Sequence, residues 1–251
     1  MEIKGQHNSR VVVLEHPQAV CQKAAELVTD LAAHAIKTSG RFTIALSGGS
    51  TPKALYELLA TDKYRQIISW EKVFVFWGDE RCVAPDHTDS NYRMVCNALL
   101  SKVPIPEANI FKMYNGSDQP IAAAAAYAQT LIHFFGLAAG EIPSFDLILL
   151  GLGADGHTAS LFPDTPAVSE KKLLVTAIYV STLSSYRLTL TVPLLNAAAH
   201  TIFLVTGDSK AGVLYNLVTN KDTLPPIPAQ LVQPSGELWV LADTAAGYLL
   251  K

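Results

Sequence analysis

The sequence has few cysteines, little net charge and no long apolar run, and each shortage excludes a class of protein. It contains 3 cysteines without a Cys-x-x-Cys pair, so a disulfide framework is not indicated. The formal net charge of −3 leaves no basic surface for nucleic acid. No stretch approaches the roughly 20 consecutive apolar residues that span a membrane. The polar start, MEIKGQHNSR, does not resemble a signal peptide, and we therefore expect a cytoplasmic protein.

The sequence does have the apolar material for a large core. Hydrophobic residues make up 49% of its 251 residues and charged residues only 16%, which argues against wholesale disorder. This length fits one large α/β domain, and no internal repeat or low-complexity linker marks a boundary. We therefore expect a single domain over residues 1–251.

Short apolar runs alternate with helical patterns along most of the chain. Strands are predicted at residues 10–15, 42–46, 73–77, 147–151, 173–180, 187–192, 201–206 and 238–241. Apolar residues at helical spacing predict helices at 19–36, 52–59, 91–100, 121–135 and 213–217. The alternation predicts an α/β fold, with a Rossmann-like, mostly parallel sheet and helices on both faces. A pairing of strands 173–180 and 187–192 with each other also fits the pattern.

Three of the predicted strands end in polar turns that contain glycine. The turns follow Leu46, Trp77 and Leu150. The carboxyl ends of parallel strands lie along one edge of a sheet, and ligands bind in the crevice there. After the third turn comes His157, and residues 158–160 predict the start of a short helix. We expect the functional site at this edge.

The first of these turns has the composition of a phosphate-binding loop. It consists of Ser47, Gly48, Gly49, Ser50 and Thr51. The two glycines let backbone N–H groups converge, the hydroxyls offer further donors, and the amino end of a helix follows. The Lys-Ser/Thr pair of a P-loop is missing, so a nucleoside triphosphate is not indicated. The alternative is an ordinary strand-to-helix turn capped by its threonine.

The turn after Leu150 matches the dinucleotide-binding pattern Gly-x-Gly-x-x-Gly at Gly151–Gly156. A dinucleotide site also needs an acidic residue about 20 positions further on, at the end of the next strand. The next predicted strand ends in Ser181-Thr182-Leu183, which contains no carboxylate. The pattern therefore does not indicate NAD.

Ionisable side chains near these turns are candidates for chemistry. His157 carries an imidazole suited to taking a proton from water near neutral pH, although a structural histidine fits the sequence as well. Arg81 fits either a bidentate contact with a phosphate or a solvated turn. Lys210 stands at a helix start, where a cation opposes the dipole and a bound anion would explain it. No metal is assigned, because a ligand spacing is missing from Cys82, Cys96 and His87.

Taken together, the motifs resemble one family, the 6-phosphogluconolactonases of the oxidative pentose phosphate pathway. The matching segments are ALSGGSTP at 45–52, FWGDER at 76–81, SNY at 90–92, DLILLGLGADGHTASLFP at 146–163, RLTLT at 187–191, LNA at 195–197 and GDSK at 207–210. The resemblance implies a Rossmann-like fold related to that of sugar-phosphate isomerases. It implies an enzyme that hydrolyses 6-phospho-D-glucono-1,5-lactone without a cofactor. The implied partner is a small phosphosugar lactone, not nucleic acid or membrane, and a monomer is favoured.

Two alternatives share the expected architecture. Glucosamine-6-phosphate deaminases have a similar phosphate loop and an Asp-Gly-His segment, but they continue Ile-Ala-Phe-Asn-Glu-Pro, and Phe162 stands here at the place of that Glu. They also carry Asp-Glu-Tyr where this chain has Asp-Glu-Arg at 79–81. A non-catalytic sugar-phosphate-binding protein would keep the loop but tolerate loss of Asp155 and His157, and both are present. The lactonase interpretation is favoured.

The residues and the resemblance together give a mechanistic hypothesis. His157 takes a proton from the water that attacks C1 of the lactone, and Asp155 orients the imidazole or the water. Arg187 stabilises the negative charge that develops on the carbonyl oxygen. Remote groups hold the phosphate and thereby orient the reacting carbon. These groups are the loop at 47–51, Arg81 and Lys210.

Overall fold

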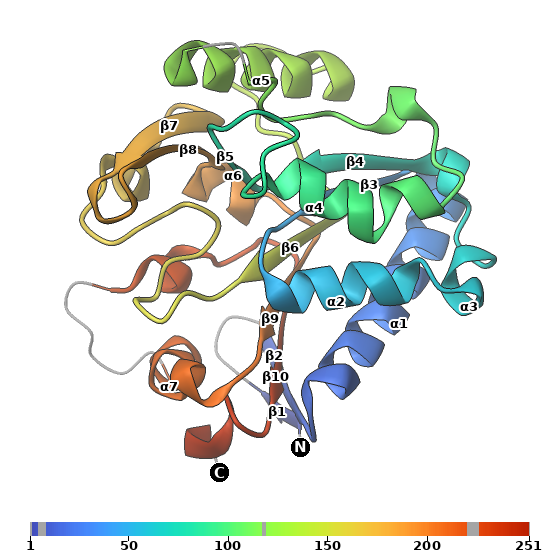
Figure 1. Ribbon diagram of the computed structural model, residues 1–251, viewed down its shortest axis with the longest axis vertical. Helices are drawn as coiled ribbons and strands as arrows, with labels where there is room; N and C mark the ends of the chain where they lie inside the picture. The colour runs from blue at the N-terminus through green and yellow to red at the C-terminus, as the bar shows by residue number, and fades with distance from the viewer. Residues whose placement is uncertain (1, 5–8, 117–118, 220–225, 251) are drawn as a thin grey trace.

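The strands form two sheets in the computed structural model, which describes residues 2–4, 9–116, 119–219 and 226–250 (Figure 1). In the larger sheet the strand order is β1-β2-β10-β9-β6-β3-β4, and every neighbouring pair is parallel except β1 with β2. The predicted Rossmann-like, mostly parallel sheet is confirmed. Its strands are β1 (Glu2–Lys4), β2 (Ser9–Leu14), β3 (Phe42–Leu46), β4 (Val73–Trp77), β6 (Leu147–Gly151), β9 (His200–Val205) and β10 (Glu237–Asp243).

Helices flank this sheet on both sides, as the alternating pattern predicts. Figure 1 shows α1 on one side of β9 and β10 and α7 on the other. At its start, α1 is capped by His16, whose Nδ1 accepts a hydrogen bond from the backbone N–H of Ala19 at 3.1 Å. The helices are α1 (Pro17–Ser39), α2 (Ser50–Leu59), α3 (Asp62–Arg65), α4 (Asn91–Ala98), α5 (Pro120–Phe135), α6 (Val192–Asn196) and α7 (Ala211–Thr219). Within the described residues, none of the helices is both long and apolar enough to cross a membrane.

The smaller sheet consists of three antiparallel strands in the order β5-β8-β7. They are β5 (Asp79–Arg81), β7 (Val175–Val180) and β8 (Ser185–Leu190). The pairing of the two later strands with each other is confirmed, whereas the segment at 79–81, expected as a turn, is a third strand. Gly78 joins the two sheets, because its N–H donates to Leu46 O at 2.8 Å and its carbonyl accepts from Leu190 N at 2.9 Å. The smaller sheet therefore stands at the carboxyl end of β4.

The short helix predicted over residues 158–160 is wrong. This segment is a tight turn, closed by a bridge between Thr158 and Leu161, with Ala159 at a φ of +48°. Polar side chains of the turn bond elsewhere: Thr158 Oγ1 donates to Gly151 O at 2.8 Å and Ser160 Oγ to Asp79 Oδ2 at 2.7 Å. Short polar side chains that bond to groups outside the turn compete with a helix.

Aromatic side chains fill the core between the larger sheet and the helices around β4. Phe76 is fully buried and stacks on Phe111, with ring centroids 4.5 Å apart, while Phe145 meets its ring edge-on at 5.2 Å. Trp77, the last residue of β4, is also fully buried. Each such burial contributes roughly 1.5–3 kcal/mol of folding free energy. The carboxyl ends of the strands, where the candidate functional residues lie, are therefore anchored in a well-packed core.

Candidate active site

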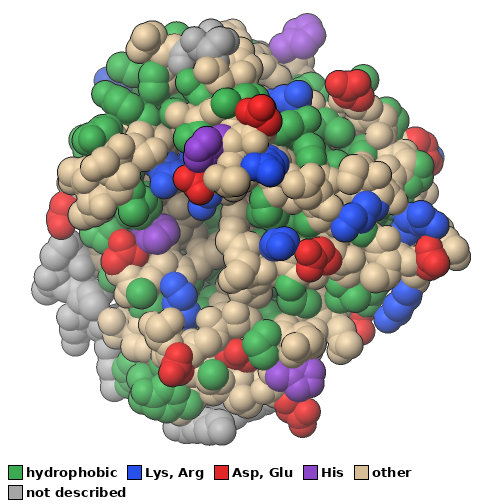
Figure 2. Space-filling view, in the orientation of Figure 1, with side chains coloured by type: hydrophobic (Ala, Val, Ile, Leu, Met, Phe, Trp, Pro, Cys, Tyr) green, Lys and Arg blue, Asp and Glu red, His purple; other side chains and the backbone are tan. Residues whose placement is uncertain are grey.

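A cavity of about 690 Å³ lies at the carboxyl edge of the larger sheet, among the turns that follow β3, β4, β6 and β9. Figure 2 shows cationic, acidic and histidine side chains gathered around a hollow on this face. The structure brings together all the residues proposed from the sequence. They are Ser47, Gly48, Gly49, Ser50, Thr51, Arg81, Asp155, His157, Arg187 and Lys210.

The loop after β3 is held from below by a buried tyrosine. Tyr56 OH accepts from Ser47 N at 3.0 Å and donates to Ser47 O at 2.9 Å, so it fixes the Ser47 backbone on both sides. A Cβ at Gly48 would overlap the side-chain amide of Asn91, which makes glycine necessary there. Among the described residues, the buried Ser47 Oγ has no hydrogen-bond partner. The loop thus presents an unsatisfied hydroxyl just before the amino end of α2.

Two arginines stand opposite each other where the smaller sheet meets the cavity. Arg81 on β5 is the register partner of Arg187 on β8. Arg81 Nη1 donates to Asp89 O at 2.6 Å, whereas Arg187 Nη1 is buried without a hydrogen-bond partner among the described residues. Burial lowers the pKa of the Arg187 guanidinium, and the neighbouring charge of Arg81 lowers it further. Guanidinium groups remain charged in proteins, so the pair creates a site that an anion would stabilise.

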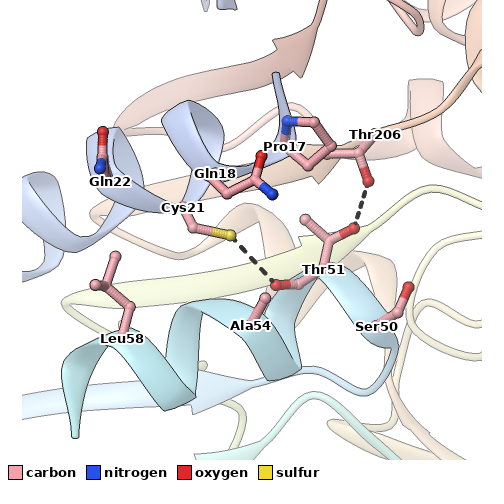
Figure 3. A pocket seen from close by; sticks show the side chains of 9 residues that line it. All are labelled: Pro17, Gln18, Cys21, Gln22, Ser50, Thr51, Ala54, Leu58 and Thr206. Atoms are coloured by element: carbon pink, nitrogen blue, oxygen red, sulfur yellow. Dashed lines mark hydrogen bonds between the residues drawn. The ribbon is translucent and has the colours of Figure 1, made fainter. Parts of the chain in front are cut away.

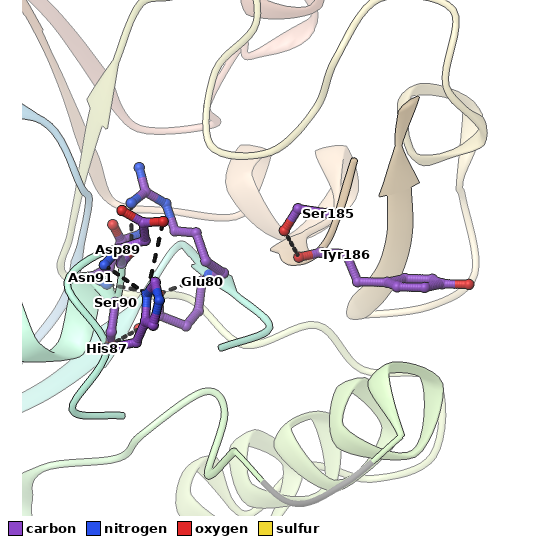
Figure 4. A network of polar contacts seen from close by, with 8 residues as sticks. Glu80, His87, Asp89, Ser90, Asn91, Ser185 and Tyr186 are labelled. Atoms are coloured by element: carbon purple, nitrogen blue, oxygen red, sulfur yellow. Dashed lines mark hydrogen bonds and ion pairs between the residues drawn. The ribbon is translucent and has the colours of Figure 1, made fainter. Parts of the chain in front are cut away.

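A buried carboxylate fixes the strand that carries Arg81. Glu80 accepts from the backbone N–H of Asn91 at 2.8 Å and from Ser90 Oγ at 3.3 Å (Figure 4). It also accepts from the backbone N–H of Tyr92 at 2.7 Å. Burial raises the pKa of Glu80, and the backbone donors at the start of α4 oppose this rise. The sequence left residues 79–81 as a solvated turn or an anion contact by Arg81, and it gave Glu80 no role, because nothing local reveals that α4 packs against this segment.

The imidazole of His157 is held by the carboxylate of Asp155. Asp155 Oδ1 lies 2.6 Å from His157 Nδ1 and also accepts from His157 N at 3.1 Å. A carboxylate accepts, so the geometry assigns the proton to Nδ1 and leaves Nε2 as the free acceptor. Partial burial raises the pKa of Asp155, but the His157 backbone N–H, ring charge and ring hydrogen bond outweigh it and lower the pKa overall. A Cβ at Gly153 would overlap both side chains, so this glycine makes room for the pair.

Among the further residues that line the cavity, sequence reasoning did not propose the side chains of Asp79, Ser160 and Phe162 for the site. Asp79 and Ser160 line the cavity and are hydrogen-bonded to each other at 2.7 Å. Phe162 lines it too, and its ring stacks on the imidazole of His157 with centroids 4.2 Å apart. These contacts depend on the turn over residues 158–161, which was expected as helix, and no periodicity in the sequence indicates such a turn.

A second cavity, of about 450 Å³, lies behind the loop between the first turns of α1 and α2 (Figure 3). Thr51 Oγ1 is hydrogen-bonded to Thr206 Oγ1 at 2.7 Å, and both residues line the two cavities. Cys21 Sγ lies 3.8 Å from Thr51 O on the far side. The Thr51–Thr206 pair therefore separates the two cavities.

Among the described residues, no group of three or more His, Cys, Asp or Glu side chains is arranged to hold a metal ion.

The fold and the cavity define a doubly wound α/β protein with a cationic pocket at the carboxyl edge of its sheet. The chain belongs to the family of glucosamine-6-phosphate isomerases and 6-phosphogluconolactonases, whose model matches residues 15–240. A 6-phosphogluconolactonase of Synechocystis is 47% identical over 242 residues, covering 96% of this chain and 98% of that protein. A 6-phosphogluconolactonase of Nostoc is 44% identical over 237 residues, covering 94% of this chain and 96% of that protein.

Solved structures agree with this assignment. The 6-phosphogluconolactonase of Trypanosoma cruzi superimposes with a TM-score of 0.87 at 30% identity, covering 100% of this chain and 99% of that one. A monomeric glucosamine-6-phosphate deaminase superimposes with a TM-score of 0.80 at 20% identity, covering 95% of this chain and 99% of that one. The second likeness shows the shared fold alone, so the choice between the two activities depends on the site.

Proposed function

We propose that the protein hydrolyses 6-phospho-D-glucono-1,5-lactone to 6-phospho-D-gluconate in the oxidative pentose phosphate pathway. The observation that carries the proposal is one cavity with cationic groups and a glycine loop beside a carboxylate-bound imidazole. The cationic groups and the glycine loop suit a phosphate, and the carboxylate-bound imidazole suits attack of water on an ester. Lactonases of 47% and 44% identity over nearly the whole chain support the same activity.

At the phosphate end, the proposed contacts come from the loop at 47–51, from Arg81 and from Lys210. The hydroxyl of Ser47, which has no hydrogen-bond partner within the described part of the chain, and the backbone N–H groups at the start of α2 offer donors to phosphate oxygens. Lys210, the last residue of the 3-10 helix η6 (Asp208–Lys210), adds a cation on the opposite wall. Binding energy from the phosphate fixes the lactone ring before any bond changes.

At the lactone end, His157 is proposed as the general base. Nε2 takes a proton from water as the water oxygen adds to C1, while Asp155 holds the imidazole by Nδ1. Arg187 Nη1, buried without a protein partner among the described residues, is proposed to donate to the oxyanion. The tetrahedral intermediate collapses by breaking the bond from C1 to the ring oxygen, which receives the proton from His157. The product acid then loses a proton to water.

The proposal is tested by following lactone opening directly. The lactone is generated in situ, spontaneous opening is subtracted, and glucosamine 6-phosphate is assayed in parallel for ammonia release. Accelerated opening without ammonia supports the lactonase, and ammonia release would support the deaminase instead. If neither substrate turned over, a non-catalytic sugar-phosphate-binding protein would be the better interpretation. The cytoplasmic location, the monomeric state and the single domain stay predictions.

Replacing Arg81 with alanine is expected to raise KM by about 10- to 100-fold while kcat changes little. The basis is that a hydrogen bond to a charged group contributes roughly 1.5–3 kcal/mol. Steady-state kinetics on the lactone measure both constants. Arg81→Lys keeps the charge but loses the planar guanidinium, so its KM should lie between those of the parent and Arg81→Ala. An unchanged KM for Arg81→Ala would reassign Arg81 to holding the Asp89 loop.

A further inference from the structure

The ring of Phe162 lies nearly flat against the imidazole of His157, with an angle of 27° between the two planes and 4.2 Å between centroids. Five positions separate the residues in the chain. On a helix, side chains at that spacing point about 140° apart. The turn between them brings the two rings face to face instead, at the wall of the cavity.

The chain around Phe162 leaves its ring little freedom. The preceding residue, Leu161, is 0% exposed and anchors the turn in the core. The carbonyl of Phe162 accepts two hydrogen bonds from Thr165, from Oγ1 at 2.7 Å and from N at 3.3 Å. The other end of the turn is tied to β6 through Thr158 Oγ1 and Gly151 O, at 2.8 Å. These contacts fix the backbone of Phe162, and its partly buried ring packs against the core, which leaves the ring little room to move.

The two contacts on His157 restrain different motions. The hydrogen bond to Asp155 fixes the Nδ1 edge of the imidazole at 2.6 Å, but it leaves the ring free to tip about the line joining the two atoms. A flat aromatic face opposes that tipping, since it favours one stacked orientation over the others. The two contacts together therefore fix the direction in which Nε2 points.

We propose that Phe162 is a positioning residue for His157, an inference that rests on the lactonase function and on His157 as its base. Phe162 supplies no proton and no charge; it acts by aiming Nε2 at the attacking water. A misplacement of about 1 Å at a reacting group can lower turnover by about 100-fold. Asp155 still restrains the ring after Phe162 is changed, so the expected loss is smaller, about tenfold.

The test compares Phe162→Leu, which keeps apolar bulk without a flat face, with Phe162→Tyr, which keeps the face. We expect Phe162→Leu to lower kcat by about tenfold with KM unchanged within about twofold. Phe162→Tyr should keep kcat within about twofold of the parent. In NMR spectra, the Cε1–H proton of His157 is assigned by its absence in His157→Ala, and Gly153 packs directly against this edge of the ring. The nuclear Overhauser effect between this proton and the Cα protons of Gly153 should weaken in Phe162→Leu and persist in Phe162→Tyr.

Parent kcat in Phe162→Leu, or an unweakened Overhauser effect between His157 and Gly153, would overturn the proposal. An equal loss in both variants would also overturn it, because the flat face would then not be what matters. Phe162→Met takes the place of Phe162→Leu if the latter melts below the assay temperature. The NMR comparison separates this proposal from the proposed function. A parent protein without lactonase activity would refute the function, while the Overhauser effect would still report whether Phe162 orients His157.

Discussion

Replacing His157 with alanine is expected to lower kcat by about 10²- to 10⁴-fold and to leave KM nearly unchanged, because general base catalysis by a positioned side chain contributes that much. The substitution leaves the loop and the cations proposed to bind phosphate unchanged, so substrate still binds. Steady-state kinetics on the lactone, corrected for spontaneous opening, measure both constants.

Two further variants serve as controls for His157→Ala. His157→Gln keeps polar bulk without a base at Nε2 and should lose as much turnover as His157→Ala. His34→Ala removes an exposed imidazole on α1 that does not line the cavity, and it should behave as the parent. Near-parent turnover in His157→Ala would remove His157 as the base and direct attention to the buried carboxylate of Asp79.

Replacing Arg187 with alanine is expected to lower kcat by about 10²- to 10³-fold, the usual cost of losing one donor to a developing oxyanion. KM should rise less, since the contact strengthens only as charge develops on the carbonyl oxygen. The measurement is kcat and KM, determined separately for Arg187→Ala and for Arg187→Lys, which keeps the charge and should retain part of the turnover.

Thermal melting separates this effect from damage to the fold. Arg187 stands beside another cation, and its Nη1 atom is buried without a partner among the described residues. Its removal therefore relieves an unfavourable charge, and Arg187→Ala should melt no lower than the parent. A rise in KM with kcat unchanged would instead place Arg187 on the phosphate, and a lower melting temperature would make it structural.

The sequence predicts the larger sheet and the meeting of its polar turns because both are local in origin. A buried parallel strand is a continuous apolar run, as in β3 and β6, and its carboxyl end must lie at one edge of the sheet. The strand-to-helix turn at 47–51 likewise carries its own signal in two glycines and a helix start. Their position in the structure follows from the topology alone.

The pairing of β7 with β8 follows from the sequence pattern, but the third strand of the smaller sheet could not be predicted. This strand, β5, is only three residues long and becomes a strand through its distant partner β8. The same pairing sets Arg81 opposite Arg187, and no sequence spacing announces it. The helix predicted over residues 158–160 is wrong for a similar reason. The side chains of this turn are hydrogen-bonded to Gly151 and Asp79, outside the segment. In each case a tertiary contact outweighs the local preference.

Within the described part of the chain, the Ser47 hydroxyl and the Nη1 atom of Arg187 have no hydrogen-bond partner, and this also affects how a ligand changes the stability of the protein. A ligand that satisfies these groups binds the native chain and not the unfolded one, and at 100 times its Kd it adds about 2.7 kcal/mol to the free energy of unfolding. We expect 6-phosphogluconate to raise the melting temperature of the parent and to raise that of Arg187→Ala less. An equal rise in both would contradict this. If bound 6-phosphogluconate stabilises the native chain in this way, the rate at which the protein is degraded should fall as the concentration of this product rises.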